Sequence, residues 1–312
     1  MMNKLLCTVL MTSCVSAVAD ESVMDKLTIS GYLDASATQV KETDQKADDK
    51  LQLDTLELRF DYQVTDRLTV NTHIRGSGVD ENVILEQAHL NYLVAEGVTL
   101  TAGKFLSVQG FEAYHSPDLY QYSTSATLVY PGMMNGVSMR YDNDLVSVYG
   151  AIVSSAWDSE DGDVGDNGYE AAIKLRPISG LSVHLGYTSE DRGNDTTRAL
   201  FNGWASYQVG QLLMAAEYNH IEDWIQPNDK GDGWLVMGNY HFNDSWGLTL
   251  RTSALKVKSA GGDDLEDISK WTVAPLYSVN ENWEMIFEYN RLKNHLTGTD
   301  TDTFAIEAIV VF

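Results

Sequence analysis

The chain has 312 residues, and 21 Lys and Arg stand against 45 Asp and Glu, a formal net charge of -24. This acidic balance argues against a nucleic-acid-binding protein, because phosphate binding needs a basic surface. Hydrophobic residues make up 44%, too many for a disordered acidic chain, and beyond the N-terminus no run approaches the ~18 apolar residues of a spanning helix. The composition therefore excludes a helical membrane protein. The only two cysteines, Cys7 and Cys14, also exclude a disulfide scaffold.

The first 19 residues have the features of a signal peptide. Lys4 supplies a positive charge, residues 5–10 begin an apolar stretch, and Ala17-Val18-Ala19 is a cleavage site of the A-x-A type. We predict a signal peptide at residues 1–19 and one mature domain at 20–312, without cysteine. Two alternatives are a hydrophobic core helix and lipoprotein processing at Cys14, and the cleavage pattern fits a signal peptide better than either.

Short polar turns recur along the mature chain and often follow a Tyr-x-Val or Tyr-x-Phe frame. The frame begins at Tyr62, Tyr92, Tyr207, Tyr240 and Tyr277. The turns centre near residues 66, 96, 143, 179, 210, 244 and 280. Between them, apolar and polar residues alternate with period two, as in residues 56–64, which is typical of strands in a sheet with unlike faces.

Long connections, most of them acidic, alternate with these turns. They lie near residues 40–49, 78–82, 107–133, 155–167, 190–196, 223–233, 259–269 and 293–301. Eight long loops and seven short turns join sixteen strands. The sequence thus predicts an all-β fold, an antiparallel up-and-down transmembrane β-barrel of about 16 strands with short periplasmic turns and long acidic extracellular loops.

The aromatic residues favour a membrane barrel over a soluble all-β array, which alternation alone cannot exclude. They cluster at strand ends, as the girdles of outer-membrane barrels do. The predicted girdle near the short turns comprises Tyr62, Tyr92, Tyr207, Tyr240, Trp246, Tyr277 and Trp283. Trp234 and Trp271 fit the opposite girdle. The last strand is apolar on one face and ends in Phe312.

The signal peptide, the alternation of short turns and long loops that predicts sixteen strands, and the terminal Phe312 resemble those of Gram-negative outer-membrane porins. More narrowly, Ala102-Gly103-Lys104-Phe105 followed by Gly110-Phe111-Glu112 looks like the beta-barrel porin family that includes OmpL-like proteins. This resemblance implies that the barrel-assembly machinery reads Phe312 as an assembly signal. It also implies that the protein forms a homotrimer and folds its third loop into the pore.

No catalytic motif appears, so we expect no enzyme, no cofactor and no metal site. The chain has no G-x-S-x-G, no phosphate-binding glycine loop and no H-E-x-x-H. The acidic run at 158–166 lacks the spaced glycine and the terminal glutamate of an EF-hand loop, and a solvated surface run is the favoured interpretation. A barrel hydrolase is disfavoured because His73, His89, His184 and His241 fall on the predicted lumen face.

Charged residues on the predicted lumen face are the candidate site. The pore-lining and constriction candidates are Arg59, His73, Arg75, His89, Arg140, Glu217, Arg251 and Glu288. Arg59 and His73 lie seven residues either side of Asp66 and should face each other across a hairpin. Charges at mid-membrane height need water or partners. They are either a channel wall that selects ions or ion pairs that stabilise the barrel.

The connection at 107–133 is the longest, and it contains a series of tyrosines that would be poorly placed in free water. Loops of this length are uncommon unless they are functional or packed on themselves. We predict that it folds inward as a constriction loop and sets Glu112 or Asp118 opposite Arg59, His73, Arg75 and Arg140. The alternative is an outward surface loop.

The predicted function is an outer-membrane porin, a passive diffusion channel for small hydrophilic solutes and ions. Its expected partners are outer-membrane lipid, lipopolysaccharide and the barrel-assembly machinery, and nucleic acid is not expected. The alternative is a barrel that serves as a surface receptor or adhesin through its acidic loops.

Overall fold

The structure is a computed structural model that describes residues 25–79, 82–158, 167–192 and 196–312. The predicted signal peptide at 1–19 and most of the acidic run at 158–166 lie outside the described residues. The described residues form sixteen β-strands and one 3-10 helix, η1 (Ser116–Asp118). No helix in these ranges is long and apolar enough to cross a membrane.

The strands follow one another along the chain with one long interruption, between β5 and β6. They are β1 (Leu27–Glu42), β2 (Asp48–Thr65), β3 (Leu68–Ser77), β4 (Asn82–Ala95), β5 (Val98–Leu106), β6 (Met133–Asp142), β7 (Val146–Val153), β8 (Gly168–Leu175), β9 (Leu181–Asp191), β10 (Thr197–Val209), β11 (Leu212–Glu222), β12 (Lys230–His241), β13 (Trp246–Lys258), β14 (Asp264–Asn280), β15 (Trp283–Asn294) and β16 (Thr299–Val311).

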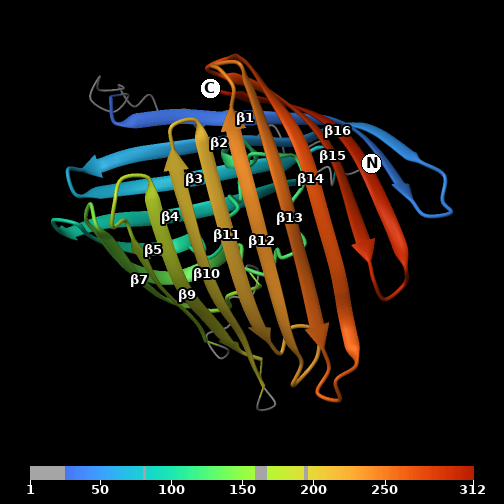
Figure 1. The fold of residues 1–312 in the computed structure, drawn as a ribbon. Helices are drawn as coiled ribbons and strands as arrows, with labels where there is room; N and C mark the ends of the chain where they lie inside the picture. The colour runs from blue at the N-terminus through green and yellow to red at the C-terminus, as the bar shows by residue number, and fades with distance from the viewer. Residues whose placement is uncertain (1–24, 80–81, 159–166, 193–195) are drawn as a thin grey trace, which may run out of the picture.

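The sixteen strands close into one barrel (Figure 1). Each strand pairs antiparallel with the next, and β1 pairs with β16 from Tyr32 opposite Val311 to Glu42 opposite Thr301. Closure leaves no free sheet edge, so every strand has a partner on both sides. The prediction of a sixteen-stranded up-and-down barrel is confirmed.

One end of the barrel, here the turn end, carries seven short connections, all close to the predicted turn centres. The opposite end of the barrel, the loop end, carries the remaining connections. Several of these are shorter than predicted: β14 begins at Asp264, inside the loop expected at 259–269. The reason is that β14 has 17 residues, whereas a strand needs only about 9–11 to cross a membrane. Polar residues can extend a paired strand beyond the membrane, and alternation does not mark where that happens.

Side chains alternate between the lumen and the outer surface along each strand. In β13, Arg251 faces inward and is 3% exposed, whereas its neighbour Leu250 faces outward and is 52% exposed. The outward face is apolar around the barrel, as contact with lipid requires.

The lumen wall also carries apolar residues, which the expectation of a polar lining did not include. Leu213, Leu235 and Met237 are buried inside the barrel. Phe111 and Tyr120, from the connection between β5 and β6, pack against them. Tyr122 packs in the same way against a second cluster, which contains Ala274, Leu276, Ile286 and Ile309. These wall residues are apolar because they form a core with that connection.

Candidate functional site in the barrel lumen

The lumen loop, residues 107–132, joins β5 to β6 and lies inside the ring of strands (Figure 1). Its hydroxyl and backbone N–H groups donate hydrogen bonds to carboxylates of the wall. The pairs are Ser107 Oγ to Glu170 of β8 at 2.6 Å, Phe111 N to Glu217 of β11 at 2.9 Å, Ser116 Oγ to Asp34 of β1 at 2.6 Å, and Ser123 N to Glu288 of β15 at 3.1 Å. Carboxylates bond N–H groups strongly, so this acidic wall fixes the path of the loop.

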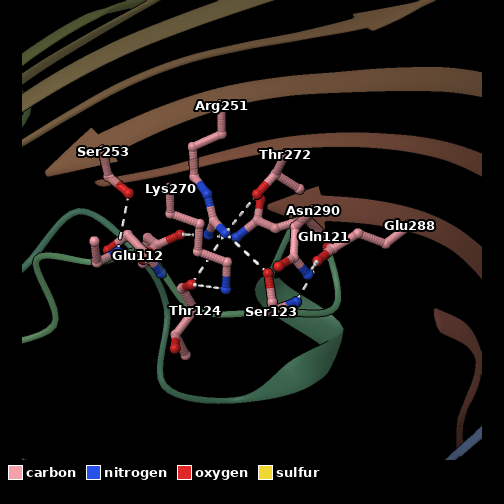
Figure 2. A network of polar contacts seen from close by, with 12 residues as sticks. Glu112, Gln121, Ser123, Thr124, Arg251, Ser253, Lys270, Thr272, Glu288 and Asn290 are labelled. Atoms are coloured by element: carbon pink, nitrogen blue, oxygen red, sulfur yellow. Dashed lines mark hydrogen bonds and ion pairs between the residues drawn. The ribbon is translucent and has the colours of Figure 1, made fainter. Parts of the chain in front are cut away.

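Arg251 of β13 is the centre of a polar network that joins the wall to the lumen loop (Figure 2). Its guanidinium forms an ion pair with Glu112, and the two side chains are 0% and 2% exposed. The guanidinium also donates to Ser123 Oγ and to the Thr124 carbonyl, each at 3.0 Å. Glu112 accepts further bonds from Gln121 Nε2 at 2.8 Å and from the Ser125 N–H at 2.9 Å. The pair is therefore buried, and both terminal guanidinium nitrogens of Arg251 and both carboxylate oxygens of Glu112 have hydrogen-bond partners, which a buried pair needs to offset its desolvation.

Two neighbouring wall residues extend this network. Lys270 of β14 donates to the Thr124 carbonyl at 2.9 Å, and Ser253 of β13 accepts from the Ala126 N–H at 2.9 Å. The loop segment 123–126 is thus held by three adjacent strands, β13, β14 and β15.

A second charged cluster lies on the wall formed by β2, β3 and β4. Arg59 and His73 are opposite each other in the β2–β3 hairpin, as their spacing from Asp66 predicted. Glu57 Oε1 lies 2.5 Å from Arg59 Nε and 3.4 Å from His73 Nδ1. The lumen loop reaches the same point, since His115 Nδ1 lies 3.1 Å from Glu57 Oε2.

The loop does not set its acidic residues opposite this cluster, which differs from the prediction. Glu112 pairs with Arg251 instead. Asp118 is exposed, and its side chain has no ion pair or hydrogen bond within the described ranges. Arg59 pairs with buried Glu57, and Arg75 Nε lies 3.0 Å from Glu86 Oε1, so their partners are carboxylates of the wall itself.

Arg140 borders a polar cavity of about 390 Å³ between the lumen loop and strands β6 to β10. Lys174 and His184 line it as well, and Lys174 Nζ lies 5.0 Å from the ring centroid of Trp204. His184 stacks on the same indole with ring centroids 5.1 Å apart. Arg140 forms an ion pair with Asp142. Arg140 is exposed and Lys174 is partly exposed, in contrast to buried Arg251.

The other predicted lumen residues differ in their surroundings. His89 is half-buried, with Nδ1 3.1 Å from the Lys104 carbonyl. Glu217 and Glu288 are 4% and 3% exposed and both bond the lumen loop. The predicted set is therefore not one ring of charges at a single constriction.

Sequence reasoning missed Glu86, which is 0% exposed and points inward. Counting back from Tyr92 with period two places it on the lipid side. The β3–β4 register shifts between His73 and Ile74, however, and a bulge of this kind exchanges the two faces of the strand beyond it. One hint is present in the sequence. Without a bulge, strict alternation would place Leu85 in the lumen and the Glu86 carboxylate in lipid.

The chain is similar to a family of known proteins. The OmpL-like family described as beta-barrel porin-2 matches residues 45–312, most of the chain. This chain belongs to that family. It is an outer-membrane porin, and the predicted family, channel class and location in the outer membrane are confirmed.

Solved structures show the same fold for the porin. Vibrio cholerae OmpT, in a loop L8 deletion mutant, is 15% identical with a TM-score of 0.70, covering 92% of this chain and 100% of that one. The anion-selective porin of Comamonas acidovorans is 11% identical with a TM-score of 0.70, covering 92% and 99%. Salmonella typhi OmpF is 17% identical with a TM-score of 0.70, covering 92% and 97%. A search of curated proteins found no match to the sequence.

The predicted girdle residues of the porin lie near the turn end with their rings partly exposed. Tyr92, Tyr240, Trp246 and Trp283 are 41 to 45% exposed, and Tyr62, Tyr207 and Tyr277 are half-buried. Phe312 lies beside Gly31, with which it exchanges two backbone hydrogen bonds of 2.8 and 3.0 Å. The last residue thus takes part in closing the barrel between β16 and β1.

Proposed function

We propose that the porin is a passive diffusion channel for small hydrophilic solutes and ions, whose open path runs along strands β2 to β8. The observation that carries this proposal is the uneven burial of the lumen wall. Arg251, Thr272 and Glu288, from β13 to β15, are at most 3% exposed because the lumen loop covers them. Arg59 and Arg75 are 28% and 32% exposed, and Arg140 is 48% exposed.

The lumen loop narrows the channel in this proposal, because it covers the wall at β13 to β15 and leaves several cationic side chains of β2, β3 and β6 partly exposed. The exposed side carries Arg59, Arg75, Arg140 and Lys174. Wall charges that face the path bias permeation toward ions of opposite sign. We therefore expect Arg140 and Lys174, which border the polar cavity, to favour anions locally, although the whole chain is acidic.

We further propose that the turn end faces the periplasm and the loop end the cell exterior. Short periplasmic turns and longer extracellular loops are the rule for barrels of this class. A homotrimer is supported by the trimer form in which Vibrio cholerae OmpT, a similar structure, has been solved. We propose no catalytic step, since diffusion through a charged lumen requires none.

Single-channel recording in planar bilayers tests this function. Purified mature porin should give discrete, long-lived openings, whereas electrical silence would favour the receptor alternative. Deletion of residues 112–123, the part of the lumen loop that crosses to β1 and β15, should raise the conductance several-fold. A conductance unchanged by that deletion would show that the lumen loop is not the constriction. As a matched control, deletion of residues 259–262 shortens a connection at the loop end and should leave the conductance unchanged.

A further inference from the structure

The cluster formed by Glu57, His73, Glu86 and His115 contains the donor set of a divalent metal site. The four side chains come from β2, β3, β4 and the lumen loop, and one ligand atom from each lies within 4.8 Å of all the others. Imidazole nitrogens and carboxylate oxygens are ligands that zinc and its neighbours in the transition series accept.

The separations between these atoms suit four ligands around one ion. Zinc binds nitrogen and oxygen at about 2.0–2.2 Å, so two ligands of a tetrahedral site lie about 3.4 Å apart. His115 Nδ1 lies 3.1 Å from Glu57 Oε2 and 3.8 Å from Glu86 Oε2. His73 Nδ1 lies 3.4 Å from Glu57 Oε1. The four ligand atoms, which lie within 4.8 Å of one another, are therefore close enough for side-chain rotations to bring them around one ion.

Unpaired buried atoms are an independent sign that this cluster binds a ligand. Glu86 is 0% exposed, and neither of its carboxylate oxygens has a hydrogen-bond partner. Glu57 Oε2 and His115 Nδ1 are also buried without one. A buried polar atom that is left without a partner destabilises the folded protein. One cation bound between them would satisfy Glu57 Oε2, His115 Nδ1 and one oxygen of Glu86.

Two arginines share the cluster, and their positions are compatible with a bound metal. Arg59 binds Oε1 of Glu57, which leaves Oε2 free. Arg75 Nε lies 3.0 Å from Glu86 Oε1 without hydrogen-bond geometry. The two arginine side chains are 28% and 32% exposed. They can therefore turn toward water when a cation enters, because long side chains keep their charged ends solvated.

We propose that Glu57, His73, Glu86 and His115 bind one divalent transition-metal ion of the zinc class. The ion would join the lumen loop, through His115, to three wall strands. It would thereby fix the part of the loop that faces the open side of the lumen. This site goes beyond the channel function and does not depend on it.

Metal retention by the purified porin tests the site. The mature protein, without a polyhistidine tag, is stripped with EDTA, loaded with Zn²⁺ and passed through gel filtration. We expect one Zn²⁺ per chain, and Co²⁺ loaded in its place should give the intense visible absorption of a four-coordinate ion. Absence of both signals in the folded wild type would overturn the proposal, and this measurement requires no variant.

Variants then assign the ligands. His115→Ala and Glu86→Gln should each weaken Zn²⁺ binding at least about tenfold. His89→Ala is the matched control, because His89 also lies on the lumen face but outside the cluster, and it should bind as the wild type does. Equal retention by His115→Ala, or equal loss in His89→Ala, would place the metal elsewhere and contradict the proposal. Channel openings recorded in EDTA test the channel separately, so failure of one proposal is distinguishable from failure of the other.

Discussion

Arg251 and Glu112, 139 residues apart in the chain, form an ion pair in the lumen from which solvent is almost fully excluded. One partner belongs to the wall and the other to the lumen loop, so the pair fixes the position of the loop relative to strand β13. A buried pair of this kind need not stabilise the fold more than apolar residues would, but breaking it leaves an uncompensated charge.

Arg251→Met should therefore destabilise the porin by about 3–5 kcal/mol, because it leaves Glu112 buried and unpaired. The double variant Arg251→Met with Glu112→Met should recover much of that loss, since neither charge remains. Unfolding by urea in lipid vesicles, followed by tryptophan fluorescence, measures both. The control is Lys258→Met, which removes an exposed cation. Equal instability of the single and double variants would contradict the role given to the pair.

Lys174→Glu should shift ion selectivity toward cations, because it reverses a charge on the polar cavity. Reversal potentials in a salt gradient across a planar bilayer measure the shift. Lys258→Glu is the matched control, since Lys258 lies at the loop end of β13 with its side chain 54% exposed, outside the cavity. An unchanged reversal potential in Lys174→Glu would mean that ions do not pass this cavity. Arg59 and Arg75 are poorer choices, because reversing them would set like charges against buried Glu57 and Glu86.

The orientation in the membrane can be read by cysteine labelling on intact cells. Gly261→Cys, in the connection between β13 and β14, should react with a membrane-impermeant maleimide. A Cβ atom at this position meets no atom closer than 3.6 Å, so the substitution should be tolerated. Asp244→Cys, at the turn end, should react only after lysis. The reverse pattern would invert the proposed orientation. Both native cysteines lie in the predicted signal peptide, so the mature background should be free of thiols.

Deletion of Phe312 should lower the amount of porin in the outer membrane and leave unassembled protein in the periplasm. The deletion removes the two backbone hydrogen bonds to Gly31 together with the terminal aromatic ring. Phe304→Ala is the control, because Phe304 is an outward-facing aromatic of the same strand, 54% exposed. Quantitative blotting of the membrane and periplasmic fractions measures the amount of porin in each. Normal membrane levels without Phe312 would rule out its role as an assembly signal.

Much of the architecture could be predicted from the sequence because a barrel repeats one local rule. Period-two alternation and regularly spaced turns are local properties, and together they predicted sixteen strands and the turn positions. The inward direction of Arg251 followed from the same alternation. Where β4 contains a bulge, the rule fails, because strict alternation would place Glu86 on the outer face.

The partners of the candidate residues could not be predicted, because they depend on the path of a 26-residue loop through space. Nothing near Glu112 in the sequence indicates Arg251, and nothing near His115 indicates Glu57. The apolar interior was missed for the same reason: Leu235 and Ile286 are accommodated on the lumen face because aromatic residues of the loop cover them. Alternation determines which way a side chain points, whereas the loop determines what it meets.

The lumen loop contacts strands on both sides of the β1–β16 junction, through Asp34 of β1 and Glu288 of β15. This has a consequence for the order of assembly. Once the first and last strands have joined, a segment that hydrogen-bonds most of the way around the inner wall has no simple way to enter. Residues 107–132 should therefore be in place while the ring is still open, and they can then guide its two ends toward each other. On this view the loop directs biogenesis before it restricts any flow of solute.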